Sequence, residues 1–80
     1  MAKYRIVFKR SVYKDLRPIP KGDLKRVFER IDALAEDPLG PDCEKLSGQE
    51  RYRIRQGVYR IVYEIEDDQL IVTIVKVCRT

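Results

Sequence analysis

The sequence predicts a single α+β domain in which two helices pack on one face of a small, mostly antiparallel sheet. Three observations support this prediction. Apolar residues recur at helical spacing between residues 21 and 36, and from residue 50 onward they alternate with polar residues at a period of two. One strand-like segment precedes the helical region. The 80 residues suffice for one modest core, so we expect one domain over residues 1–80, in the order β-α-α-β-β-β.

The first half of the chain should contain one strand and both helices. Residues 4–9, YRIVFK, alternate and predict the first strand. Ser11 is placed to cap a short helix from Val12 to Leu16. A second helix is expected from Lys21 to Glu36, because it cannot continue past Pro38. Its apolar stripe is expected to pack in the core, and a groove for a partner is the less favoured interpretation.

The second half should be a three-stranded meander. We expect strands near residues 50–56, 58–66 and 69–77, joined by tight turns at Gln56-Gly57 and Asp67-Asp68. The last strand, LIVTIVKV, consists mostly of β-branched residues. This composition is typical of a central strand that is buried on both faces.

Residues 51–63, RYRIRQGVYRIVY, contain four basic residues and no acidic one. Alternation places all four on the face turned away from the helices, namely Arg51, Arg53, Arg55 and Arg60. A Gln56-Gly57 turn would set Arg53 directly opposite Arg60. Like charges in that position destabilise a sheet, so a bound anion would explain why the sequence has them.

Nucleic acid is the anion that this pattern favours. Guanidinium groups bind phosphate oxygens in bidentate fashion, and Arg53 and Arg55 should lie about 7 Å apart, which is comparable to the step between phosphates in an extended strand. A solvated face whose charges are partly neutralised by Glu50, Glu64 or Glu66 is the alternative. A membrane surface is less favoured because no amphipathic helix carries the cations. Three tyrosines could stack on bases, although the expected register places them in the core: Tyr52, Tyr59 and Tyr63.

Several classes of chemistry are disfavoured by composition. The chain has no histidine and only two cysteines, Cys43 and Cys78, which we expect as free thiols. No metal and no cofactor is therefore expected. No apolar run approaches the roughly 18 residues of a membrane helix and the N-terminus lacks a signal-like stretch, so a cytoplasmic location is expected. Arginine can align and stabilise a phosphate but is a poor general base, so composition supports RNA binding better than RNA cleavage.

Two segments carry a resemblance to a known family: KRSVYKDLRPIPK near the N-terminus, and PDCEKLSGQERYRIRQGVYRIVYEIEDDQLIVTIVKV through the meander. With KLSG, YRIR, GVYRIVYEI and IVKV in that order, the chain resembles the RelE/ParE superfamily of small toxins along its whole length. The resemblance implies the same β-α-α-β-β-β fold and a cognate antitoxin as partner. RelE-like members cleave mRNA in the ribosomal A site, whereas ParE-like members poison DNA gyrase.

The resemblance also implies site residues. Arg53 and Arg55 match paired basic positions of RelE-like toxins, and Arg60 matches the arginine of their GxYR motif. These three are the expected catalytic residues, with Arg60 at the scissile phosphate and the others orienting the substrate. Further RNA contacts are expected from Arg51, Lys45 and Arg79.

The end of the sequence, KVCRT, departs from the family pattern. Cys78 stands where a glycine is usual, Arg79 where a histidine or lysine is usual, and Thr80 where an arginine is usual. The tyrosine that commonly follows is absent, so we expect this chain to bind RNA yet cleave it slowly. The alternatives are a ParE-like gyrase inhibitor and a non-catalytic RNA- or antitoxin-binding module.

Overall fold

The computed structural model describes residues 3–46, 48 and 50–79. Its elements are β1 (Arg5–Phe8), α1 (Val12–Leu16), α2 (Lys21–Leu34), β2 (Glu44–Lys45), β3 (Arg51–Gln56), β4 (Tyr59–Glu66) and β5 (Ile71–Arg79). The predicted α+β class and the order of the main elements are confirmed.

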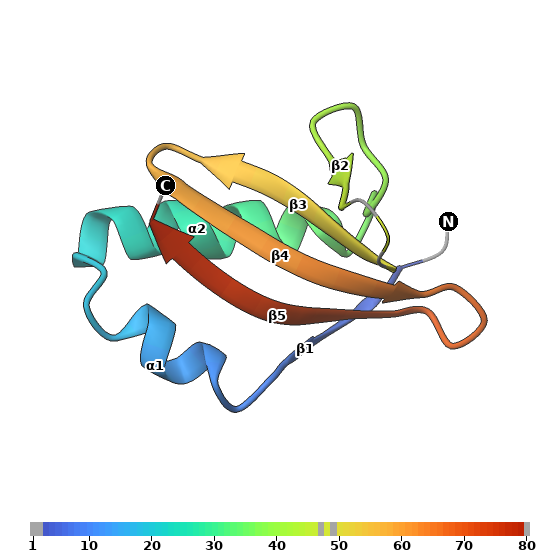
Figure 1. Cartoon of the computed structure of the whole chain (residues 1–80), viewed down its shortest axis with the longest axis horizontal. Coiled ribbons are helices and arrows are strands. Elements are labelled where there is room, and N and C mark those ends of the chain that lie inside the picture. Colours follow the sequence, from blue (N-terminus) through green and yellow to red (C-terminus); the bar gives the residue numbers. More distant parts are fainter. Residues whose placement is uncertain (1–2, 47, 49, 80) are drawn as a thin grey trace.

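The five strands form one sheet in the order β1-β5-β4-β3-β2. β1 runs parallel to β5, and the other neighbours are antiparallel. In Figure 1, α2 crosses behind β3 and β4, and α1 lies beside β5. The buried residues of both helices belong to one core with those of the central strands. The opposite sheet face is therefore open. Within the described ranges, no helix has the length and apolarity needed to cross a membrane.

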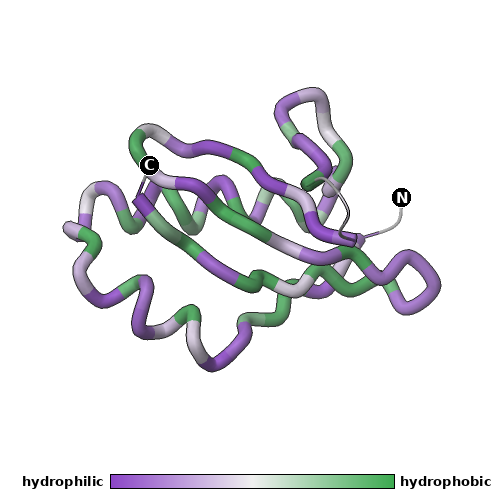
Figure 2. The backbone as a smooth tube through the Cα atoms, viewed as in Figure 1, coloured by the Kyte–Doolittle hydropathy of each residue, from purple (hydrophilic) through white to green (hydrophobic). Residues whose placement is uncertain are grey.

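The core lies between the sheet and the helices. It contains one residue row from each central strand and the inward stripe of α2, including Ile54, Ile61, Tyr63, Ile74 and Val27. The central strands and α2 carry the apolar stretches of Figure 2. This arrangement explains the alternation along β4, since each second residue must be apolar to face the helices.

The tyrosines of β4 belong to this core, as the sequence predicts. Tyr59 and Tyr63 are both buried. The Tyr63 hydroxyl donates a 2.6 Å hydrogen bond to the Pro38 carbonyl, and its ring stacks on Tyr52 with centroids 5.9 Å apart. Burial is the main cause that raises the pKa of Tyr63 above its usual value.

Several predicted boundaries are wrong by a few residues. The second helix ends at Leu34 instead of Glu36, and Ser11 occupies the N-cap position of α1 without a side-chain hydrogen bond. The Asp67-Asp68 turn is a four-residue loop, because Glu66 pairs with Ile71. β5 consequently spans Ile71–Arg79 and not residues 69–77.

Two strand predictions need correction as well. β2, a two-residue edge strand beside β3, was not predicted, because two residues display no periodicity. β5 is central, between β1 and β4, but only its helix-facing side is fully buried. Its other side carries half-buried residues and the exposed Lys76, since neither α1 nor α2 covers that face.

A β-bulge in β5 changes which face its last residues occupy. Val62 pairs with Lys76 whereas Tyr63 pairs with Ile74, so Val75 is the extra residue. Strict alternation from Ile74 would direct Lys76 toward the helices. The bulge instead places Lys76 on the open face, in the same row as Val62.

Candidate functional site

The hairpin between β3 and β4 fixes the positions of the arginines. Its turn consists of Gly57 and Val58, because Gln56 pairs with Tyr59. Gly57 has a φ of 61°, the left-handed value that tight hairpin turns require at their first central position. The expected Gln56-Gly57 turn is thus wrong by one residue, and every cross-strand pair moves by two residues.

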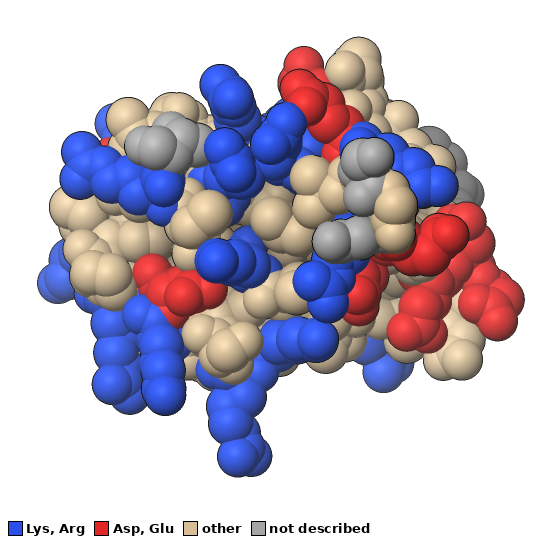
Figure 3. Space-filling view, viewed as in Figure 1, with Lys and Arg blue, Asp and Glu red and all other residues tan. Residues whose placement is uncertain are grey.

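The arginine that lies opposite Arg60 is consequently Arg55 and not Arg53, which pairs with Val62. A shift of two residues leaves each side chain on its predicted face. Arg53, Arg55 and Arg60 therefore share the open face, and we call these three residues the arginine cluster. Figure 3, which views this face, shows Lys and Arg side chains gathered over the strands.

The Arg55–Arg60 pair is the unusual feature of the cluster. Arg55 is exposed and Arg60 is half-buried. The Nε atom of Arg60 is buried and has no hydrogen-bond partner among the described residues. Neither side chain forms an ion pair with any acid in the described part of the chain. Two cations lie directly opposite each other, and one of them has an unsatisfied donor. A bound anion would relieve both unfavourable features.

The other two arginines of β3 are neutralised. Arg51 forms a 3.0 Å ion pair with Glu64, its cross-strand partner. Arg53 forms an ion pair with Glu44 of β2. The interpretation of a partly salt-bridged face therefore holds for these two arginines, although of the acids proposed only Glu64 takes part.

Glu44 is electrostatically tied to the whole cluster. The hydrogen bond from Arg53 lowers the pKa of the Glu44 carboxyl below its ordinary value, and the charge of Arg53 acts in the same direction. The charges of Arg55 and Arg60 lower this pKa further, so the carboxylate senses all three guanidinium groups.

Sequence reasoning missed two residues of this face, Glu44 and Lys76. Glu44 joins it through β2, whose two residues give no pattern. Lys76 joins it through the bulge in β5, and the unbroken apolar run of that strand conceals the extra residue. Val62, between Arg53 and Lys76, has only 9% of its surface exposed although no helix covers it. Long neighbouring side chains can cover an apolar residue with their aliphatic stems.

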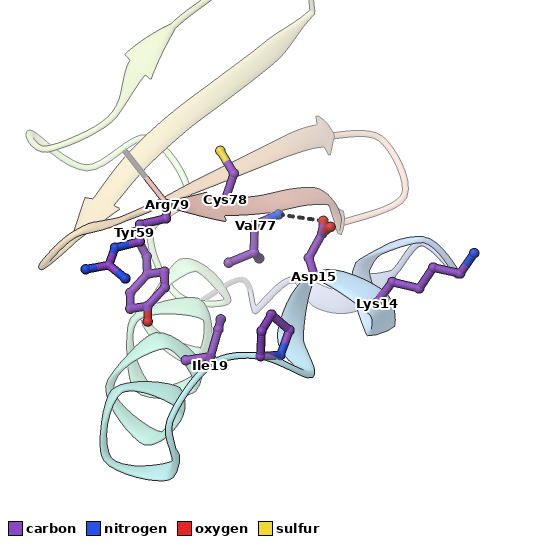
Figure 4. Close-up of a pocket in the computed structure, with 8 residues that line it drawn as sticks. Lys14, Asp15, Ile19, Tyr59, Val77, Cys78 and Arg79 are labelled. Atoms are coloured by element: carbon purple, nitrogen blue, oxygen red, sulfur yellow. Dashed lines mark hydrogen bonds between the residues drawn. The ribbon is translucent and has the colours of Figure 1, made fainter.

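Two predicted RNA-binding residues lie away from the cluster. Lys45 pairs with Tyr52, so it faces the opposite side of the sheet from Arg53. Arg79 pairs with Tyr59 and lines a pocket of about 340 Å³ near α1, together with Ile19 and Val77 (Figure 4).

The same close-up shows a hydrogen bond that connects α1 to β5. The Asp15 carboxylate accepts a 3.1 Å hydrogen bond from the backbone N–H of Val77 (Figure 4). Cys78 projects to the other side of the strand from Val77, toward the open face, where it is the cross-strand partner of Arg60. The structure thus brings together Arg53, Arg55 and Arg60, with Arg51 at the margin, and separates Lys45 and Arg79 from them.

Comparisons with known proteins identify the family. Residues 4–80 match the family model described as ParE toxin of type II toxin-antitoxin system, parDE. A relative from Methanocaldococcus jannaschii named RelE1 is 32% identical over 81 residues, covering 96% of this chain and 90% of that protein.

Solved structures agree with this assignment. The fold resembles the toxin-antitoxin complex RelBE2 from Mycobacterium tuberculosis, with 27% identity, a TM-score of 0.87 and coverage of 98% of this chain and 99% of that one. It also resembles the archaeal RelE-RelB complex from Pyrococcus horikoshii, with 30% identity, a TM-score of 0.85 and coverage of 99% and 96%. The chain belongs to the RelE/ParE superfamily of toxins from type II toxin-antitoxin systems.

Proposed function

We propose that this toxin acts as a RelE-like endoribonuclease that cleaves mRNA in the ribosomal A site. The observation that carries the proposal is the Arg55–Arg60 pair, two directly opposed cations without an acidic partner among the described residues. Guanidinium forks suit phosphate oxygens, and the open sheet face allows an extended strand to approach them.

The chemistry that these residues support is charge stabilisation. The 2′-hydroxyl oxygen of the RNA attacks the adjacent phosphorus, the bond from phosphorus to the 5′-oxygen breaks, and a cyclic phosphate and a 5′-hydroxyl result. Arg60 would contact the phosphate as its negative charge grows, while Arg53 and Arg55 align the backbone. Arginine stays protonated, so the 2′-hydroxyl proton must pass to a group outside the cluster, and the leaving oxygen must receive one likewise. Because no arginine of the cluster can transfer these protons, we expect this chain to cleave RNA slowly.

An antitoxin is the second partner that we propose. Phe8 lies between Tyr13 of α1 and Phe28 of α2, with ring centroids 6.4 and 6.1 Å away, and the Tyr13 and Phe28 side chains are exposed. Basic residues surround this aromatic group in the sequence, from Lys9 to Arg26. The two solved relatives described above are complexes with RelB antitoxins. A RelB-like segment with apolar and acidic side chains would complement this surface.

Primer extension on mRNA translated by purified 70S ribosomes tests the nuclease proposal. We expect toxin-dependent stops within A-site codons, which Arg55→Ala and Arg60→Ala abolish or greatly reduce. Arg26→Ala is the matched control, because it removes the same charge from α2, where Arg26 forms an ion pair with Asp23. Equal activity of all three variants would contradict the role of the cluster.

Gyrase inhibition is the second candidate function, and the match to the ParE family model favours it. A supercoiling assay with purified gyrase, run with the same protein preparation, separates the two candidates. Inhibition of gyrase without A-site cleavage would replace the nuclease proposal.

A further inference from the structure

The Arg53–Glu44 ion pair is built asymmetrically. Only 22% of the Arg53 side chain is exposed, against 65% of the Glu44 side chain. The guanidinium is therefore held in place by its surroundings, whereas the carboxylate reaches it from the solvent side. Glu44 belongs to β2, a two-residue strand at the edge of the sheet that pairs with β3.

Glu44 also occupies a distinct place in the charge pattern. On the sheet it is the cross-strand neighbour of Arg53, which lies two residues from Arg55 on the same face. A carboxylate and a phosphate present similar oxygens to a guanidinium fork. The carboxylate of Glu44 thus holds the position that a phosphate would take if an RNA strand bound by Arg55 and Arg60 continued toward the sheet edge.

We propose that Glu44 is an internal competitor for the Arg53 subsite, displaced when single-stranded nucleic acid binds along the cluster. Within the arginine cluster of the unbound protein, Arg55 and Arg60 are the two members without a carboxylate partner among the described residues. A bound strand exchanges one phosphate for the carboxylate at Arg53, and the charge of Glu44 then opposes the strand. Glu44 therefore weakens RNA binding and confines the tightest anion contact to the Arg55–Arg60 pair. This inference rests on the proposed function for its ligand class.

The test is binding of a fluorescein-labelled 12-nucleotide oligouridylate to the full chain, followed by fluorescence anisotropy between 50 and 200 mM KCl. Glu44→Gln should bind severalfold more tightly at the lowest salt. Its log–log salt slope should be steeper by about 0.7, the value for one phosphate contact on a single strand, because in the wild type the displaced Glu44 carboxylate takes up a cation that offsets the one released at Arg53. Glu66→Gln is the matched control, because it removes the same charge from the open face without releasing an arginine.

The dependence on Arg53 makes the test specific. In an Arg53→Gln background, Glu44→Gln should give no more than the gain of the Glu66→Gln control. Equal gains from Glu44→Gln and Glu66→Gln in the wild-type background would overturn the proposal, as would weaker binding by Glu44→Gln.

A measurement on the wild-type protein keeps the proposal testable if a variant misfolds. In a carbon-13 NMR pH titration, the chemical shift of the Glu44 carboxyl carbon should report a pKa below the ordinary value in the unbound protein. Saturating oligouridylate should return this pKa toward the ordinary value. An unchanged titration would refute displacement. Absence of A-site cleavage together with these binding results would remove the nuclease proposal and leave the competitor role of Glu44 standing.

Discussion

Replacing Arg60 with methionine should make the protein more stable and less active. The substitution keeps a long unbranched side chain while it removes a charge that faces Arg55. Relief of a like-charge pair across strands contributes about 0.2–1 kcal/mol. Removal of the buried Nε atom, which has no partner among the described residues, relieves a further ~1–3 kcal/mol. Together these contributions should raise the free energy of unfolding by about 1–4 kcal/mol.

Urea and thermal unfolding, followed by circular dichroism, measure this gain. The urea midpoint should increase at an unchanged m-value. The Tm should rise by about 4–8 °C for each kcal/mol in a domain of this size. Arg51→Met is the matched control, because Arg51 forms a 3.0 Å ion pair with Glu64, and losing a surface ion pair costs about 0–1 kcal/mol.

An Arg60→Met protein with lower stability than the wild type would refute this reasoning. It would mean that the Arg60 guanidinium makes a net favourable contribution in the absence of an anion. The same variant should also lose A-site cleavage and bind oligouridylate with a shallower salt dependence. Higher stability combined with lower activity is the expected signature of a residue retained for function.

Three further predictions concern stability. Tyr63→Phe should lower the free energy of unfolding by about 1–3 kcal/mol, because it leaves the Pro38 carbonyl without its donor. Since burial raises the pKa of Tyr63, its contribution is complete below pH 10.0 and is lost as pH rises further, so the variant should show a flatter alkaline profile in pH-dependent melts. The pKa of Glu44 is lowered, so its contribution is present above pH 4.5 and is lost as pH falls, and Glu44→Gln should flatten the acid side of the same profile. Gly57→Ala should lower the free energy of unfolding in urea by about 1–2 kcal/mol, because Gly57 has a φ of 61°, which is unfavourable for alanine. The added Cβ would meet nothing within 4 Å, so this cost comes from the backbone conformation alone. Gly22→Ala, a control in the first turn of α2, should instead stabilise by about 0.5–1 kcal/mol.

The sequence predicts those parts of the fold that depend on periodicity. β3 and β4 alternate strictly, so the face of each arginine follows from the pattern even though the predicted register was wrong. The error has a physical reason. A two-residue turn can be built with glycine at its first or its second position, and only the backbone shows that Gly57 comes first.

Features without periodicity could not be predicted. β2 exists because its two residues add backbone hydrogen bonds to β3, and this tertiary event brings Glu44 to Arg53. The sequence gives no signal of the bulge at Val75 either, because β-branched residues suit both faces of a strand. Both omissions affect the candidate site, because they supply its acid and its additional lysine, Lys76.

The distribution of acids over the open face indicates where an anion should bind. Glu44 neutralises Arg53 from the sheet edge, and Glu64 neutralises Arg51 at the end of β3 that is remote from the turn. Uncompensated charge is thereby left at the turn end, on Arg55 and Arg60. Lys76 lies nearby on the adjacent strand, opposite Val62.

A strand of RNA should therefore make its strongest contact at the turn end and extend from there toward β2. In that direction each further phosphate meets an arginine that already has a carboxylate, so affinity should grow less than additively with the length of the strand. Short oligouridylates of increasing length would show this as a salt slope that stops rising once the turn-end cations are occupied. In Glu44→Gln the slope should continue to rise for one more phosphate, because no displaced carboxylate then offsets the counterion released at Arg53.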